Sequence, residues 1–209
     1  MRRLITAIAV LAALSLAFLV SAGSVAATQR SGPLAASLST IGPQNGGGEP
    51  SLAIDRDGTL YVSVPTLDPN ETAFYRSTSN GRTWRKLGVA DTNVGDTTVN
   101  IDRSGAVYQT NLNNVGEVDQ LQVDVFKSFD RGKTWPQKGQ GPVVSSNSSN
   151  MPLLVDRQWL DAWIPPGGNT NTARVYLTYH DFVPSQIWVN TSTDGGKTFG
   201  IPVDVINDP

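Results

Sequence analysis

Cysteine is absent from this chain of 209 residues, and histidine occurs once, at His180. Without cysteine, no disulfide can hold the fold and no lipid can be attached as in a lipoprotein, so a hydrophobic core and backbone pairing must supply the stability. A single histidine without further ligands makes no zinc site of the usual kind. The sequence therefore predicts no metal centre and no cofactor.

Glutamate is also scarce, and helical patterning is missing. The only glutamates are Glu49, Glu71 and Glu117, and no basic run interleaves with aromatic residues, which argues against a nucleic-acid partner. Beyond residue 27, no segment spaces its apolar residues with the helical period of 3.6. The abundant residues are Gly, Thr, Ser, Asn and Asp, which favour strands joined by turns.

The N-terminus carries the one long apolar segment. Arg2 and Arg3 precede a mainly apolar run at 4–20, and small residues follow at 21–27. This order is typical of a secretory signal peptide over 1–27, with an uncleaved signal anchor as the alternative. Its removal leaves 14 basic and 18 acidic residues, a net charge of −4. We therefore expect a secreted, extracellular protein that is free of the membrane after cleavage.

After a flexible lead-in at 28–48, a pattern of strands and turns occurs three times, in units of about 49–90, 91–145 and 150–205. The expected strands are 50–54, 59–64, 73–77 and 85–87 in the first unit, 97–101, 106–110 and 121–127 in the second, and 153–160, 174–179 and 186–190 in the third. Four short strands in a unit of this length are typical of a β-propeller blade. The pattern predicts an all-β chain in which 49–209 form about three four-stranded blades.

Each unit follows its third expected strand with the turn pattern Ser-x-Asp-x-Gly-x-Thr and then Trp or Phe. Residues 128–135 and 192–199 match at every fixed position, whereas 77–84 has Ser79 in place of Asp. The residues of the pattern are Ser77, Gly81, Thr83 and Trp84 in the first unit, Ser128, Asp130, Gly132, Thr134 and Trp135 in the second, and Ser192, Asp194, Gly196, Thr198 and Phe199 in the third.

These residue types suit a tight hairpin turn that ends in a buried aromatic ring. Glycine takes positive φ without steric cost. Asp130 and Asp194 can accept hydrogen bonds from backbone N–H groups of the turn, and the Ser and Thr hydroxyls can satisfy further turn groups. The ring at the end can anchor the hairpin by burial between sheets. The aspartates are therefore interpreted as turn formers, with Asn80-Gly81 compensating for Ser79 in the first unit.

The repeated turn resembles the Asp box, or bacterial neuraminidase repeat, of the sialidase-like β-propellers, and it resembles the secreted actinobacterial-type members in flanking segments such as 49–51 and 156–159. The resemblance implies a propeller of six blades when complete. Because three blades cannot close a ring, the expectation is a C-terminally truncated chain or, as the alternative, a half-propeller that closes by self-association.

For activity, the resemblance implies three arginines around a substrate carboxylate, a Tyr–Glu nucleophile pair and an Asp acid–base. The Arg-Ile-Pro segment that supplies the first arginine in the family is absent, and no Tyr–Glu pair can be assigned. The remaining parts of the family's site belong to later blades, and the chain ends at Pro209. No catalytic residue is therefore carried over from the family.

Two residues at the starts of expected inner strands are candidates for a site. Asp96 follows a glycine where propeller loops approach the central channel, and it either belongs to a site or caps a turn. Arg157 has the corresponding place in the third unit, and it either binds an anion in the channel or pairs locally with Asp156 or Asp161.

Two further segments are weighed and set aside. His180 and Asp181 lie at a strand end, where they either line a pocket or are satisfied loop residues. Residues 55–58, Asp-Arg-Asp-Gly, have the spacing of a two-strand turn and lack the later ligands of a calcium loop.

Two function classes remain open from the sequence. The first is a secreted glycoside hydrolase that resembles exo-α-sialidases in its full-length form. The second is a non-catalytic secreted propeller that binds glycans or proteins, because one scaffold hosts many functions. Glycans are the expected partner in both classes, and the missing blades are expected from further C-terminal sequence or from self-association.

Overall fold

The computed structural model describes residues 39–41, 48–67, 70–92, 95–114, 121–141, 155–181 and 185–206. All of them belong to one compact unit, Ser37–Pro209. The expected signal peptide at 1–27 and most of the expected lead-in at 28–48 lie outside the described residues. Across the described ranges, none of the helical structure reaches the length and hydropathy of a membrane span.

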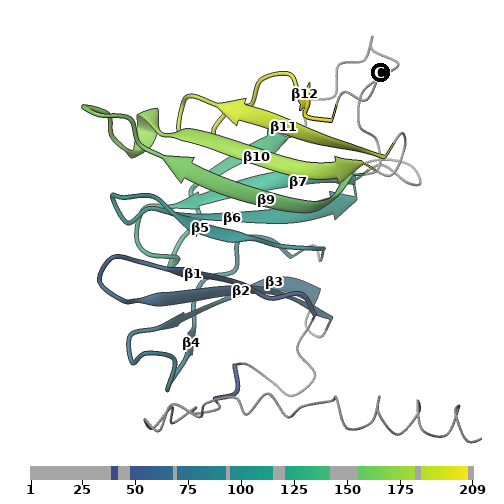
Figure 1. The fold of residues 1–209 in the computed structure, drawn as a ribbon. Coiled ribbons are helices and arrows are strands. Elements are labelled where there is room, and N and C mark those ends of the chain that lie inside the picture. The colour runs from purple at the N-terminus through teal and green to yellow at the C-terminus, as the bar shows by residue number, and fades with distance from the viewer. Residues whose placement is uncertain are drawn as a thin grey trace, which may run out of the picture. The chain divides into compact units, whose positions relative to one another are not determined.

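The described chain is built from three four-stranded antiparallel sheets, and the strands of each sheet follow chain order (Figure 1). Sheet 1 comprises β1 (Ser51–Ile54), β2 (Leu60–Leu67), β3 (Asn70–Ser77) and β4 (Arg85–Lys86); sheet 2 comprises β5 (Val99–Ile101), β6 (Val107–Asn114), β7 (Leu121–Ser128) and β8 (Gln137–Gly141); sheet 3 comprises β9 (Val155–Trp163), β10 (Arg174–Asp181), β11 (Gln186–Ser192) and β12 (Val203–Asp204). The single helical turn of the described residues is the 3-10 turn η1 (Thr170–Thr172). The predicted all-β fold with three four-stranded blades is confirmed.

The strand bounds differ from the sequence pattern mainly at the strand ends. The β2–β3 pairing continues to Leu67 opposite Asn70, so the segment at 65–72, which the pattern left outside the strands, belongs mostly to this hairpin. Backbone pairing continues through these polar residues, and the Thr66 hydroxyl adds a 3.0 Å hydrogen bond to the Glu71 carbonyl. The outer strands β8 and β12 had no clear alternating pattern in the sequence, since both are short and polar or exposed.

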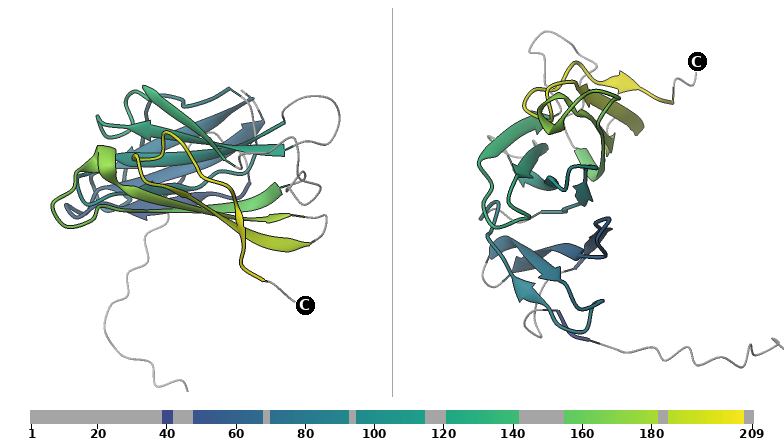
Figure 2. Two further views of the ribbon diagram at one scale, coloured as in Figure 1. Left: turned by 90° about the horizontal axis from the view of Figure 1, so that it is seen from above. Right: turned by 90° about the vertical axis from the view of Figure 1, so that its left-hand side faces the viewer.

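The sheets pack in chain order, with sheet 2 between sheets 1 and 3 (Figure 2). The first strand of sheet 2, β5, contacts the first strands of both neighbours, β1 and β9. The first strands therefore lie innermost and share an axis, as in propeller blades. Because β1, β5 and β9 run the same way relative to this axis, their starting residues meet at one end of it, and the hairpin turns that follow them meet at the other.

The hydrophobic core lies between neighbouring sheets. Tyr61 and Phe74 of sheet 1 pack with Val99 and Val107 of sheet 2, and the Trp135 ring meets Phe74 edge-on with centroids 5.0 Å apart. A larger cluster joins sheets 2 and 3 and includes Phe199, the aromatic residue of the third repeated turn. Trp84, the aromatic residue of the first turn, packs on the outer side of sheet 1. Burying one such ring contributes about 1.5–3 kcal/mol.

The three repeated turns share one hydrogen-bond pattern. In the second, the Asp130 carboxylate accepts the backbone N–H of Lys133 (3.0 Å) and Thr134 (2.9 Å) and the hydroxyl of Thr134 (2.7 Å). The Ser128 hydroxyl accepts the N–H of Gly132 at 2.7 Å. The third turn repeats these bonds, with Asp194, Thr198, Ser192 and Gly196 in the corresponding places. In the first, Ser79 Oγ replaces the carboxylate and accepts the Thr83 N–H at 2.9 Å.

The turns also bring each sheet close to the preceding one. A Cβ on Gly88, after β4, would overlap the Lys133 carbonyl of the second turn, and a Cβ on Gly139 of β8 would overlap the Gly196 carbonyl of the third. Glycine at these two positions therefore permits a backbone-to-backbone approach that repeats from one sheet pair to the next.

Candidate functional site

A small pocket lies where the starts of β1, β5 and β9 meet. Its volume is about 140 Å³, and residues 49–51, 96–98 and 157–159 line it, so each of the three sheets contributes one short segment. These segments are far apart in the sequence and are brought together only by the packing of the inner strands. The end of a propeller axis is a place where loops of several sheets can present side chains to one ligand.

The carboxyl groups of Glu49 and Asp96 line this pocket, and that of Asp156 in β9 lies beside Asp96. The Asp96 carboxyl lies within hydrogen-bonding reach of the carboxyls of Glu49 and Asp156. Burial and these two acidic neighbours raise the pKa of Asp96 to about 7, because each disfavours a further negative charge. The pKa of Glu49 is lowered, first by its hydrogen bond with Asp96 and then by Arg157. Asp96 is therefore protonated in about half of the molecules at pH 7, and the lowered pKa of Glu49 favours its ionised form.

Arg157 reaches the carboxyl cluster because β9 is irregular at this point. The register of β9 against β10 shifts between Trp159 and Asp156, so two residues of β9 lie opposite one of β10, and Arg157 takes a φ of 52°. Such bulges redirect a side chain. The Arg157 guanidinium lies 2.9 Å from the carboxylate of Glu49, which itself has a φ of 47°. Two strained non-glycine residues in contact at one pocket are typical of a functional site.

The backbone of Asp96 is fixed between sheets 2 and 3. Its carbonyl accepts the N–H of Leu112 at 3.0 Å and a hydrogen bond from Nε2 of Gln158. Gln158 is 1% exposed, and its Oε1 has no hydrogen-bond partner among the described residues. A buried carbonyl oxygen without a donor is costly. Gln158 therefore keeps a buried acceptor without a donor among the described residues, next to the carbonyl of Asp96.

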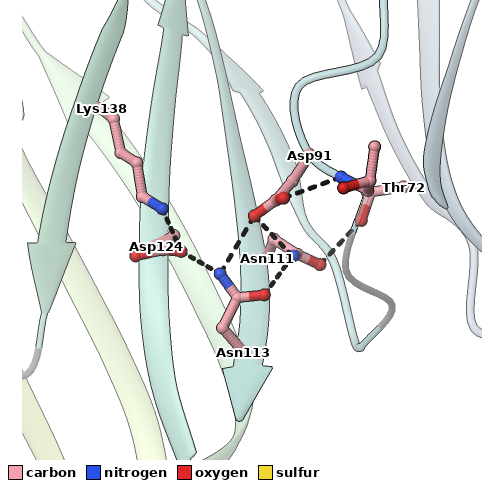
Figure 3. Close-up of polar contacts among 7 residues, drawn as sticks. Thr72, Asp91, Asn111, Asn113, Asp124 and Lys138 are labelled. Carbon is pink, nitrogen blue, oxygen red and sulfur yellow. Dashed lines mark hydrogen bonds and ion pairs between the residues drawn. The ribbon is translucent and has the colours of Figure 1, made fainter. Parts of the chain in front are cut away.

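A buried polar network anchors the segment that leads to Asp96 (Figure 3). The Asp91 carboxylate accepts hydrogen bonds from Asn111 (3.3 Å) and Asn113 (3.0 Å) of β6, and its carbonyl accepts the N–H of Thr72 of β3 at 3.1 Å. Lys138 adds an ion pair to Asp124 at the other side of Asn113, as Figure 3 shows. The network ties sheets 1 and 2 together beside the pocket, so it supports the position of Asp96.

The structure brings Asp96 and Arg157, the two site candidates from the sequence, into the same pocket. Arg157 pairs with Glu49, which precedes β1, and forms no ion pair with Asp156 or Asp161 among the described residues. His180 lies on β10 opposite Asp156 in the strand register, one strand outward from the pocket.

The turn at 55–58, at the opposite end of the inner strands, shows ordinary turn bonding. Its Asp55 and Asp57 carboxylates accept the N–H of Arg56 and Thr59. No group of three acidic, histidine or cysteine residues suited to a metal occurs in the part of the chain that the structure describes.

Sequence reasoning missed Glu49, Asp156 and Gln158. Each stands next to a strand start in the sequence, but nothing in their spacing indicates that they meet. A signal was nevertheless present, because a glutamate is rare in this chain and Glu49 directly precedes the first inner strand. The turn residues of the repeated pattern, in contrast, line none of this pocket.

Comparison with solved structures supports the fold. A GH93 α-L-arabinofuranosidase of Fusarium graminearum in complex with arabinobiose is similar with TM-score 0.60 and 17% identity, over 79% of this chain and 51% of that chain. A Penicillium chrysogenum α-L-arabinanase, also with arabinobiose, has TM-score 0.59 and 17% identity over 77% and 50%. The chain thus spans about half the length of these structures. Identity this low shows a shared fold.

The comparisons leave the family open. A Hadza microbial sialidase is similar at TM-score 0.47 and 21% identity, over 74% of this chain and 29% of that chain, a level that carries no argument about sialidase identity. No protein-family model and no curated protein matches the sequence. The three four-stranded sheets of this chain form the blades of a partial β-propeller.

Proposed function

We propose that this chain belongs to a secreted glycan-active propeller, a glycoside hydrolase whose proton donor is Asp96. The observation that carries the proposal is the carboxyl cluster at the inner strand starts, where burial beside Glu49 and Asp156 raises the pKa of Asp96 to about 7. Glycosidic bond cleavage needs a carboxylic acid that protonates the leaving oxygen, and burial with acidic neighbours is how enzymes raise such a pKa. The fold shared with glycan-degrading enzymes adds support.

We assign separate tasks to the residues of the cluster. Asp96 donates the proton, and Glu49 and Asp156 keep it on Asp96 until a substrate oxygen arrives. Arg157 holds Glu49 in place through their ion pair. Paired carboxyls that act as acid and nucleophile stand about 5–5.5 Å apart in retaining glycosidases and about 6.5–9.5 Å in inverting ones. Glu49 and Asp96 are in hydrogen-bonding contact, so they act as one proton-holding unit.

The test compares the full chain with Asp96→Asn on a panel of fluorogenic glycosides that includes an α-L-arabinofuranoside and an α-sialoside. We expect Asp96→Asn to lower turnover by about 10²–10⁴-fold. Turnover by the unchanged chain should fall as pH rises through about 7, because Asp96 then loses its proton. The matched control is Asp55→Asn, at the other end of the same inner strands, which should leave turnover unchanged.

A non-catalytic glycan-binding propeller is the second candidate, and the small size of the pocket favours it. The same panel separates the two functions. If the folded chain binds oligosaccharides but cleaves none of the panel, the hydrolase proposal is wrong and the binding function stands. Preferential turnover of the sialoside would instead support the exo-α-sialidase activity that the family resemblance implies.

A further inference from the structure

Apolar side chains are exposed on the free faces of both outer sheets. On sheet 3, Val203 is 66% exposed and the Tyr176 ring is also open to solvent; on sheet 1, Ile54 is 64% exposed and Leu52 is exposed beside it. The opposite faces of the same two sheets, which are turned towards sheet 2, are buried in the core. Exposed apolar patches usually mark a protein contact, so each free face is a candidate for packing against another sheet.

The contact between sheets 1 and 2 shows how one sheet fits the next. We call the four side chains that sheet 1 presents to sheet 2 the forward set, and the four that sheet 2 presents in return the backward set. The forward set is Ala53, Tyr61, Phe74 and Leu87, and the backward set is Val99, Ile101, Val107 and Trp135. All eight are apolar or aromatic, so burial of these side chains stabilises the contact.

The free face of sheet 3 repeats most of the forward set. In both sheets, the serine that opens the repeated turn pairs with the start of the second strand, and counting from this pair gives the corresponding positions. The sheet 1 residues Tyr61, Phe74 and Leu87 correspond in order to Tyr176, Val189 and Val203 of sheet 3. The fourth position is polar, since Asp161 replaces Ala53 and accepts a hydrogen bond from Asn100 of sheet 2. Sheet 3 therefore presents three of the four apolar positions with no sheet on them in the described chain.

The free face of sheet 1 keeps the complete backward set. The same count matches Val99, Ile101, Val107 and Trp135 of sheet 2 with Leu52, Ile54, Leu60 and Trp84 of sheet 1. Ile41, which precedes β1, packs on a neighbouring part of this face against Val62 and Tyr75, and it leaves Leu52 and Ile54 exposed. Sheet 1 can therefore receive a forward set as sheet 2 does.

From these matching sets, we propose that sheet 3 of one copy packs on sheet 1 of a second copy, as sheet 1 packs on sheet 2 within the chain. Two such contacts, related by a two-fold axis, close six sheets into one ring and cover both free faces. A groove of about 420 Å³ on sheet 3, lined by Trp159, Tyr176 and Val205 among others, receives side chains of the second copy. This inference does not depend on the glycan-active function.

Sedimentation equilibrium of the full chain tests the contact between about 1 and 100 µM, where a Kd of micromolar order is measurable. We expect the mass of two chains at the upper end. Ile54→Lys on sheet 1 and Tyr176→Glu on sheet 3 each place a charge in the apolar contact, so each should raise the Kd at least about tenfold. Both residues are exposed, which leaves the core undisturbed, and thermal melts check that each variant is folded.

The control is Phe129→Gln, which removes an exposed ring from the turn of sheet 2, a sheet with both faces packed. It should leave the mass of two chains unchanged. All samples contain the same apolar N-terminal segment, so only the differences between variants report on the two faces.

An equal mixture of Ile54→Lys and Tyr176→Glu gives the sharpest result. Such a pair has one native contact, and its second contact holds introduced charges of opposite sign, so the mixture should regain the mass of two chains that each variant lost. A loss of association in Tyr176→Glu alone, with Ile54→Lys unaffected, overturns the proposal in favour of sheet 3 packing on sheet 3. A single-chain mass at every concentration, a ladder of larger species, or association that neither variant weakens also overturns it.

Discussion

At the residue scale, the central feature is the Asp96 carboxyl, whose ionised form is disfavoured in the folded chain. The pKa of Asp96 is raised by burial and by Glu49 and Asp156, so the folded chain binds a proton that the unfolded chain has already released at neutral pH. The stability associated with this proton is fully present below the ordinary aspartate pKa and is lost as pH rises through about 7. Functional sites often retain such unfavourable groups.

Removing the charge should therefore stabilise the protein, and only at high pH. We expect Asp96→Asn to melt at a higher temperature than the unchanged chain at pH 8, with the difference shrinking towards pH 4. Thermal melts across this range measure it, with Asp55→Asn as the control. A constant difference at all pH values, or a lower melting temperature at pH 8, contradicts the assigned charge state.

Residue identity alone predicts part of this site. Asp96 and Arg157 were identified because each stands where an inner strand begins. Their partner Glu49 and the supporting Gln158 were missed, since their contacts cross sheets and depend on a bulge in β9 that turns Arg157 into positive φ. A local irregularity of this kind leaves no mark on an alternating pattern.

At the element scale, the repeated turns were predictable because their bonds are local. Two carboxylates, Asp130 and Asp194, each accept several hydrogen bonds inside their own turn. Burial would raise the pKa of Asp130, but the bonds from Thr134 and its neighbours outweigh this and lower it to about 2. Their contribution to stability is present above the ordinary aspartate pKa and is lost as pH falls through it towards about 2.

The first turn offers a direct test of this chemistry, because Ser79 makes only part of the bonds. We expect Ser79→Asp to stabilise the protein by about 1 kcal/mol at pH 7, since a carboxylate accepts charge-assisted bonds from the Thr83 N–H and hydroxyl. Asp130→Ser, the reverse change in the second turn, should destabilise by a similar amount. Urea unfolding measures both, and a destabilised Ser79→Asp refutes the equivalence of the turns.

At the scale of the whole molecule, packing between sheets was not predictable from the pattern of strands. Gly88 and Gly139 belong to no motif in the sequence, yet each admits the backbone of the next sheet. We expect Gly139→Ala to destabilise by about 2 kcal/mol in urea unfolding, because its Cβ overlaps the Gly196 carbonyl. The control Gly48→Ala, which meets no atom within 4 Å, should cost little. Equal costs would mean that sheets 2 and 3 pack less closely.

The outer face of sheet 3 carries exposed apolar side chains, among them Tyr176, Val203 and Val205. Apolar patches of this kind usually mark an interaction surface. The face supports the proposal that further sheets cover it, from sequence beyond this chain or from self-association. The hydrodynamic size of the full chain in solution distinguishes these two sources.

The account depends most directly on the proton that Asp96 holds at neutral pH. Carbon-13 NMR of the aspartate carboxyls, with Asp96→Asn used to assign the signal, follows that proton in the folded chain. The structure predicts a titration midpoint near 7 for Asp96, with Asp130 titrating near 2 in the same spectra. A midpoint for Asp96 near the ordinary aspartate value of about 3.9 would contradict the account.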